Sequence, residues 1–200
     1  MLNLRKFYTI MTMERINAEK SYHQFRAQYP VFIYESYKIS ISGNDVAIEF
    51  DFNIPGLIRF KPVSVFQIGN LIPNLDKRVG QIYPLLENIA FNIGMIELIS
   101  YWKPTCSPAL IVKSGHLTDE QKNWWKTLYY NGLGEFFYLN SIAPDHTFIQ
   151  IEAEGPVNHQ SVNIPLTEKF LIPIGGGKDS AVTLELIKNA AKEITPFIIN

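Results

Sequence analysis

Residues 46–54 carry a large apolar side chain at every second position, with Ala47, Glu49, Asp51 and Asn53 between them. Successive side chains of a β-strand point to opposite faces, so this alternation predicts a strand with one buried face. The apolar positions are Val46, Ile48, Phe50, Phe52 and Ile54. Residues 31–42, rich in β-branched and aromatic side chains, come shortly before, and the turn-forming Gly43-Asn44-Asp45 lies between the two segments. We therefore predict that the two segments pair as an antiparallel hairpin.

A helix is predicted over residues 77–102, where apolar side chains recur at spacings of three and four. The predicted apolar stripe consists of Ile82, Leu85, Leu86, Ile89, Ile93 and Ile96. Pro104 ends the helix, because the residue before a proline disfavours helical geometry. This most apolar segment is interrupted by Glu87, Asn88, Asn92 and Glu97, so we expect no membrane span. No secretion signal is recognised in the first 13 residues either.

Shorter elements are predicted after this helix. Residues 109–112 form a short apolar strand candidate. Thr118 and Gln121 then make a capping box, in which each side chain accepts from the other residue's backbone N–H at the start of a helix. Asn131-Gly132 is expected to interrupt that helix. Two further β-like runs follow, at residues 147–151 and 162–166.

Composition narrows the class of protein. The 200 residues are 46% hydrophobic and 18% charged, which excludes a mainly disordered chain. The formal net charge of −1 provides no general attraction to nucleic acid or to an anionic membrane. A single cysteine, Cys106, rules out an internal disulfide framework or a zinc site of several cysteines, and fits a reducing compartment. We expect a cytoplasmic protein without nucleic-acid or membrane partners.

The last forty residues predict a strand, a glycine loop, a helix and a second strand. The strand spans residues 169–174, the helix 179–193 and the second strand 195–199, with Gly175-Gly176-Gly177 as the loop. This order predicts a βαβ unit with parallel strands, and ligands of such sheets lie beyond the carboxyl ends of the strands. Glycines leave backbone N–H groups uncovered, and the helix start is electropositive. The expected occupant is an anion, most simply a phosphate.

Known phosphate loops differ in how well they fit. The Walker pattern requires a glycine where Ile172 stands and a hydroxyl residue where Asp179 stands. The dinucleotide fingerprint requires a third glycine where Ser180 stands. The run Gly175-Gly176-Gly177-Lys178-Asp179-Ser180 instead resembles the Ser-Gly-Gly-x-Asp-Ser signature of PP-loop ATP pyrophosphatases, with glycine replacing the first serine. The alternative interpretation is a plain tight turn between strand and helix.

Two upstream segments narrow the resemblance from a broad class of enzymes to one family. Ser100-Tyr101-Trp102-Lys103 and the run from Leu128 to Asn140, which contains Gly132-Leu133-Gly134-Glu135-Phe136, precede the glycine loop in that order. Together they resemble the UDP-N-acetylmuramoyl-L-alanyl-L-glutamate epimerase family over about residues 85–190. Trp102 stands where that family's pattern leads us to expect a tyrosine. The resemblance implies that ATP is split to AMP and diphosphate while the terminal glutamate of this peptidoglycan precursor is inverted.

The resemblance also implies site residues. Gly175, Gly176, Gly177 and Ser180 would hold the ATP phosphates, Lys178 would add positive charge, and Asp179 would either cap the helix or help to position Mg²⁺. Lys103 and Glu135 are the catalytic candidates, and Tyr101 and Asn140 the substrate-binding candidates. Structural alternatives stay open for these four: a packed aromatic ring for Tyr101, a cation at a helix end for Lys103, and solvated polar groups for the others. No metal site built from protein side chains alone is predicted.

We assign structural roles, without chemistry, to two tryptophans and to the histidines. Trp124 and Trp125 are expected in the core. The four histidines show no spacing typical of metal ligands, and we interpret them as surface or loop residues; they are His23, His116, His146 and His159.

We therefore predict an α/β protein in two parts. Residues 1–160 form an α+β domain with an antiparallel hairpin and helices, and residues 161–200 begin a parallel PP-loop domain. Because one βαβ unit cannot cover a parallel sheet on both faces, we expect a longer protein, of which this stretch alone is inactive. The partner is a nucleotide-linked muramoyl dipeptide; no oligomeric state is predicted. The alternatives are another PP-loop enzyme, such as an amide ligase or a transfer RNA modification enzyme, and a nucleotide-binding module without turnover.

Overall fold

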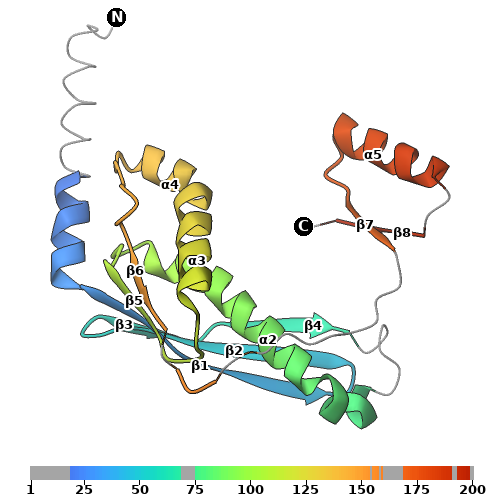
Figure 1. Ribbon diagram of the computed structural model, residues 1–200, viewed down its shortest axis with the longest axis horizontal. Helices are drawn as coiled ribbons and strands as arrows, with labels where there is room; N and C mark the ends of the chain where they lie inside the picture. The colour runs from blue at the N-terminus through green and yellow to red at the C-terminus, as the bar shows by residue number, and fades with distance from the viewer. Residues whose placement is uncertain are drawn as a thin grey trace, which may run out of the picture. The chain divides into compact units, whose positions relative to one another are not determined.

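The computed structural model describes residues 19–68, 75–153, 155–157, 159, 169–190 and 193–198. For residues 75–79 and 81 it describes the backbone alone. The chain divides into two compact units, Met1–Ser161 and Val162–Asn200. Both units combine helices with strands (Figure 1), as the predicted α/β class requires.

The first unit is built on one mixed sheet. Its strands are β1 Val31–Ser42, β2 Asp45–Ile54, β3 Ile58–Phe60, β4 Val63–Gln67, β5 Ala109–Val112 and β6 Gln150–Glu152. The sheet order is β3-β2-β1-β5-β6, and β4 also pairs with β2. A helical segment, residues 19–28, leads into β1.

The predicted hairpin is confirmed. Strands β1 and β2 pair antiparallel from Ser42 opposite Asp45 to Ile33 opposite Asn53, with a bulge between Tyr34 and Ser36. Gly43 in the turn has φ of +59°, a left-handed conformation that glycine adopts without steric strain. All five apolar positions of the alternating pattern are buried in the core.

Parallel pairing within the first unit was not predicted. Strand β5 lies parallel to both β1 and β6, and the chain between β5 and β6 forms the helices α3 Asp119–Gly132 and α4 Gly134–Leu139. The unit therefore contains a β5-α3-α4-β6 crossover. The β-like run at residues 147–151 was placed too early. Asp145 Oδ1 accepts from the backbone N–H and the hydroxyl of Thr147 at 2.7 and 2.6 Å, which makes a turn there, and β6 begins at Gln150.

Helix α2, Leu75–Trp102, confirms the long predicted helix, but its predicted stripe is buried only in part. Ile82 and Ile93 are partly buried against the core. Ile89 and Ile96 are 42% and 58% exposed. The side chains that pack against the sheet are Ala90, Phe91, Met95, Leu98 and Trp102. Ile82–Trp102 is long and apolar enough to cross a membrane by length and composition alone. Only 28% of its most apolar part is buried within the structure.

Helix α3 begins as predicted and joins the core by one face. The capping box is present, with the Gln121 backbone N–H donating to Thr118 Oγ1 at 3.2 Å and the Thr118 N–H donating to Gln121 Oε1 at 2.9 Å. Trp125 is buried, as expected. Trp124 is 58% exposed, so its assignment to the core was wrong. The two residues are adjacent in the helix and point about 100° apart, so only one can face the sheet.

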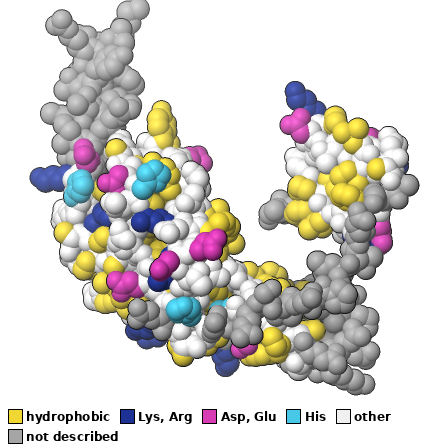
Figure 2. Space-filling view, viewed as in Figure 1, with side chains coloured by type: hydrophobic (Ala, Val, Ile, Leu, Met, Phe, Trp, Pro, Cys, Tyr) yellow, Lys and Arg dark blue, Asp and Glu magenta, His cyan; other side chains and the backbone are white. Residues whose placement is uncertain are grey.

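The second unit is a small βαβ unit, as predicted. Strands β7 Phe170–Pro173 and β8 Ile194–Phe197 pair in parallel, and helix α5 Lys178–Asn189 connects them. The helix ends four residues earlier than expected. Among the described residues of this unit only Ile172 is buried, and hydrophobic side chains lie on its surface (Figure 2). The exposed apolar residues are Leu171, Val182, Leu186 and Ile198. The predicted run at 162–166 lies outside the described residues.

Candidate functional site

The triglycine loop lies open between β7 and α5. Gly176 has φ of +77°, so a side chain at this position would strain the backbone. A Cβ atom added to Gly175 or Gly177 would meet no atom within 4 Å. No described residue therefore fills the space beside these two glycines.

The start of α5 offers N–H donors without a side-chain cap. Gly177 is the N-cap residue and has no side chain to accept from the first turn. Ser180 Oγ donates to the Gly177 carbonyl at 2.8 Å, which places that hydroxyl beside the loop. Uncapped N–H groups and the positive end of the helix dipole together favour an anion.

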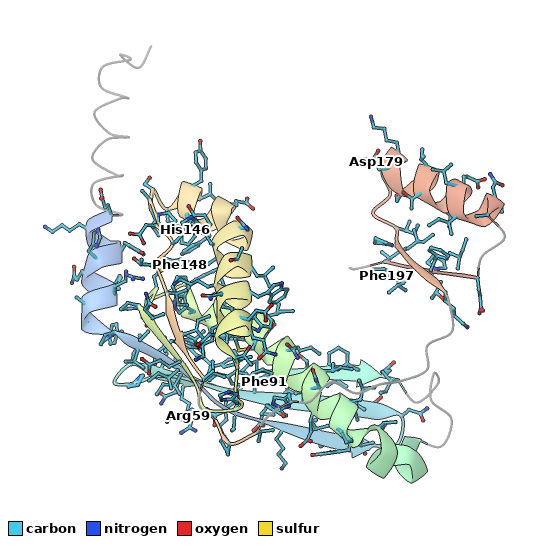
Figure 3. The ribbon with its side chains drawn as sticks, viewed as in Figure 1. Arg59, Phe91, His146, Phe148, Asp179 and Phe197 are labelled. Atoms are coloured by element: carbon cyan, nitrogen blue, oxygen red, sulfur yellow. The ribbon has the colours of Figure 1, made fainter. Side chains whose placement is uncertain are left out.

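Lys178 and Asp179 flank this helix start. Both are exposed, and neither forms an ion pair among the described residues (Figure 3 shows Asp179 in the first turn of α5). Asp179 would repel a bare phosphate but would suit one that carries Mg²⁺, which binds through one or two carboxylates and phosphate oxygens. The described residues contain no cluster of three or more His, Cys, Asp or Glu that could hold a metal without phosphate. The residues at the loop are therefore compatible with a phosphate group that carries Mg²⁺.

A pocket of about 440 Å³ in the first unit brings two of the predicted residues together. It lies between residues 19–28, the end of α2 and helix α4. Lys103 Nζ sits 5.7 Å from the centre of the Phe136 ring, within the range of a cation–π contact. Asn140 donates from Nδ2 to the Phe136 carbonyl at 2.8 Å, which leaves its side-chain oxygen as an acceptor. The Lys103 ammonium has no carboxylate partner among the described residues, so the pocket suits an anionic group.

Residues that the sequence analysis did not select also shape this pocket. Ser21, Tyr22 and Phe25 close one side; the helical spacing of Tyr22 and Phe25 was the only available signal for them. Cys106 adopts φ of +48°, and its thiol donates to the Lys103 carbonyl at 3.2 Å. Burial raises the pKa of the Cys106 thiol to about 12, so it stays protonated and is unsuited to nucleophilic attack.

Tyr101 and Glu135 do not line this pocket. The Tyr101 ring packs against Phe60 and Phe52 at centre distances of 4.9 and 5.4 Å, and burial raises its pKa. That contact accounts for Tyr101 as a packed aromatic residue. Glu135 is exposed in the first turn of α4, where a carboxylate stabilises the helix dipole.

The described histidines do not gather around a common point. His146 stacks on Tyr130 at 4.4 Å and His159 on Phe91 at 4.4 Å, while His23 meets Tyr22 edge to face at 5.2 Å. Each of these three imidazoles contacts a neighbouring aromatic ring. These contacts are compatible with our interpretation of the histidines as surface or loop residues.

Several proteins of known name are similar to this chain. A protein of Xanthomonas oryzae pv. oryzae is 30% identical over 103 residues, which cover 52% of this chain and 23% of that protein. One of Salinispora tropica is 26% identical, covering 84% of this chain and 36% of the relative; one of Micromonospora sp. is 25% identical, covering 84% and 37%. All three are named UDP-N-acetyl-alpha-D-muramoyl-L-alanyl-L-glutamate epimerase.

The matched region spans only about a quarter to a third of the length of these curated relatives. No solved structure shows significant similarity to the chain. The family described as the MurL N-terminal domain matches residues 23–200, which include Lys103, Asn140 and the triglycine loop, and the chain therefore belongs to that family.

Proposed function

We propose that this chain provides the nucleotide-binding loop and part of the substrate site of an ATP-dependent epimerase. Its substrate would be UDP-N-acetylmuramoyl-L-alanyl-L-glutamate, whose terminal L-glutamate is converted to D-glutamate as ATP is split to AMP and diphosphate. One observation carries the proposal: an open, uncapped triglycine loop begins α5 in a chain whose named relatives are epimerases for this compound.

The energetics of glutamate inversion explain why ATP would be used. Removing a proton next to a free carboxylate places a second negative charge beside the first. Enzymes lower barriers of this kind by about 8–23 kcal/mol, whereas a positioned general base contributes only about 10²- to 10⁴-fold in rate. Transfer of AMP to the carboxylate oxygen, with release of diphosphate, cancels its charge and acidifies the neighbouring C–H. Hydrolysis after inversion then returns the carboxylate and AMP.

The residues of the triglycine loop and of the first turn of α5 have separate roles in this proposal. Backbone N–H groups of Gly175, Gly176 and Gly177 would hold the phosphates, together with the hydroxyl of Ser180. Lys178 would add charge, and Asp179 would be a ligand of Mg²⁺.

In the first unit the Lys103 ammonium would bind a carboxylate of the substrate, and the Asn140 side chain would accept from a peptide N–H. Both line one pocket, which supports this part of the proposal. Tyr101 and Glu135 stay predictions from the resemblance, because their contacts in the structure are those of a packed ring and a helix-start carboxylate.

The test has a binding arm and a turnover arm. Binding of ATP with Mg²⁺ to this 200-residue chain is measured by titration calorimetry, and release of AMP is measured with the dipeptide precursor in the protein that carries this chain. Asp179→Asn and Ser180→Ala are expected to lower nucleotide affinity and turnover at least tenfold. Thr183→Ala is the matched control, since its hydroxyl donates to the backbone carbonyl of Asp179 within α5 at 2.8 Å, whereas the Ser180 hydroxyl donates to the loop carbonyl of Gly177.

Unchanged turnover in both loop variants would overturn the site assignment. Tight ATP binding without AMP release, whichever acceptor is supplied, would identify a nucleotide-binding module and contradict the epimerase function.

A further inference from the structure

A second pocket of the first unit lies at the carboxyl ends of its parallel strands. Its volume is about 220 Å³, and its lining combines the loops after β5 and β6 with α2 and the first turns of α3. The two loops are joined by backbone hydrogen bonds, from the His116 N–H to the Val157 carbonyl at 2.8 Å and from the Leu117 N–H to the Ala153 carbonyl at 3.2 Å. Ligands of α/β sheets bind at this edge, beyond the carboxyl ends of the strands.

Close backbone contacts hold these loops in place. A Cβ atom on Gly155 would lie 2.5 Å from the Lys113 carbonyl oxygen, and one on Gly115 would lie 2.7 Å from the Phe91 ring. Phe91 projects from α2 toward the strands (Figure 3). A pocket whose walls are already ordered loses little conformational freedom when it binds a ligand.

The polar side chains that line this pocket are amides and imidazoles, the imidazoles being those of His116 and His159. Gln121 uses its side-chain oxygen to accept from the Thr118 N–H, which leaves its NH₂ group as a donor. Asn92 donates its NH₂ group to Asn88, which leaves its oxygen as an acceptor. Burial lowers the pKa of His159, whose ring stacks on Phe91 at 4.4 Å. None of the described residues that line the pocket is Lys, Arg, Asp or Glu.

Trp124 adds an aromatic surface at the pocket. The side chain is 58% exposed and meets Trp125 edge to face, with ring centres 4.9 Å apart and planes at 84°. The ring face of an exposed tryptophan suits a flat ligand with apolar C–H groups, and amide groups beside it suit hydroxyl and acylamino groups. A phosphate is disfavoured here, because Asp119 and Glu120 in the first turn of α3 offset the positive end of the helix.

From this lining we propose that the pocket binds a neutral, N-acylated sugar ring, which stacks on Trp124 and is hydrogen-bonded by Gln121 and Asn92. The identification of that ring with the N-acetylmuramoyl part of the substrate rests on the proposed function. The capacity to bind such a sugar does not.

The test uses the 200-residue chain without nucleotide and N-acetylglucosamine as the probe. Saturation-transfer NMR and tryptophan fluorescence are expected to show saturable binding in the millimolar range. Trp124→Ala should weaken it at least fivefold. Gln121→Glu keeps an oxygen that can cap α3 but loses the NH₂ donor, and should weaken it at least threefold. Tyr138→Ala is the control, because Tyr138 is a 78% exposed aromatic residue of α4 outside this pocket.

The absence of saturable binding to the unaltered chain would overturn the inference, as would equal binding by all three variants. Stronger, Trp124-dependent binding of uridine or of L-alanyl-L-glutamate would also overturn it, because the pocket would then serve another part of the substrate. The assay contains no ATP. Sugar binding together with an inactive triglycine loop would therefore contradict only the proposed function, and an active loop without sugar binding would contradict only this inference.

Discussion

Gly94 and Tyr34 show how closely single residues control the core of the first unit. A Cβ atom added to Gly94 would overlap the Tyr34 hydroxyl, and both residues are buried. The ring of Tyr34 also packs on Phe52 at 5.2 Å and on Phe91 at 6.1 Å. Glycine is therefore needed in the middle of α2, although it is a weak helix former, because only its backbone leaves room for the tyrosine.

Replacing this glycine with alanine should destabilise the protein. In Gly94→Ala the new methyl group would overlap the Tyr34 side chain, and overpacking of this kind costs about 1–3 kcal/mol. The free energy of unfolding from urea titration measures the effect. Gly80→Ala in the same helix is the control: nothing lies within 4 Å of its added Cβ, so it should leave stability unchanged or raise it by up to about 1 kcal/mol. Equal stability of the two variants would contradict the contact.

At the scale of elements, α2 and α3 differ in how well their patterns predict their packing. Helix α2 is apolar on more than one side, so its spacing pattern is satisfied by the stripe through Ile89 and Ile96 and also by the one through Phe91 and Met95. The aromatic residues of the sheet select the second stripe. Helix α3 has polar residues around most of its surface, and the local capping box alone marks where it begins.

The cap of α3 can be tested within the helix. Thr118→Ala removes the acceptor of the Gln121 N–H and should lower the free energy of unfolding by about 1 kcal/mol. Thr127→Ala is the same substitution in the same helix, but its hydroxyl donates to the Asn123 carbonyl and caps nothing. Thermal unfolding followed by circular dichroism should give a lower midpoint temperature for Thr118→Ala than for Thr127→Ala. The opposite order would show that the capping box does not stabilise the helix.

At the scale of the whole molecule, the two compact units differ in how much apolar surface they bury. The first has a core that extends from β1 and β2 through α2 to α3 and α4, with Trp102 donating from Nε1 to the Ser107 carbonyl at 2.8 Å. In the second, no described side chain of α5 is buried. Because packing of an apolar face supplies most of the stability of a helix, the two units should differ in local stability.

Hydrogen exchange would measure this difference. Backbone amides of residues 91–98 in α2 should exchange only through global unfolding, whereas those of residues 182–186 in α5 should open locally. We expect protection factors at least tenfold smaller in α5. Equal protection of both helices in this chain would show that α5 is stabilised by contacts beyond those described.

Local signals in the sequence determined much of the fold and the position of the triglycine loop. The alternation in β2, the turn at Gly43, the capping box at Thr118 and the order of β7, loop, α5 and β8 each lie within a short stretch, where neighbours in the chain decide the conformation. Only the tertiary structure decided which stripe of α2 is buried, that β5 and β6 are parallel, and that Lys103 and Asn140 share a pocket while Tyr101 does not. These features depend on which surfaces meet across long separations in the chain, and spacing patterns carry no information about an element's partner.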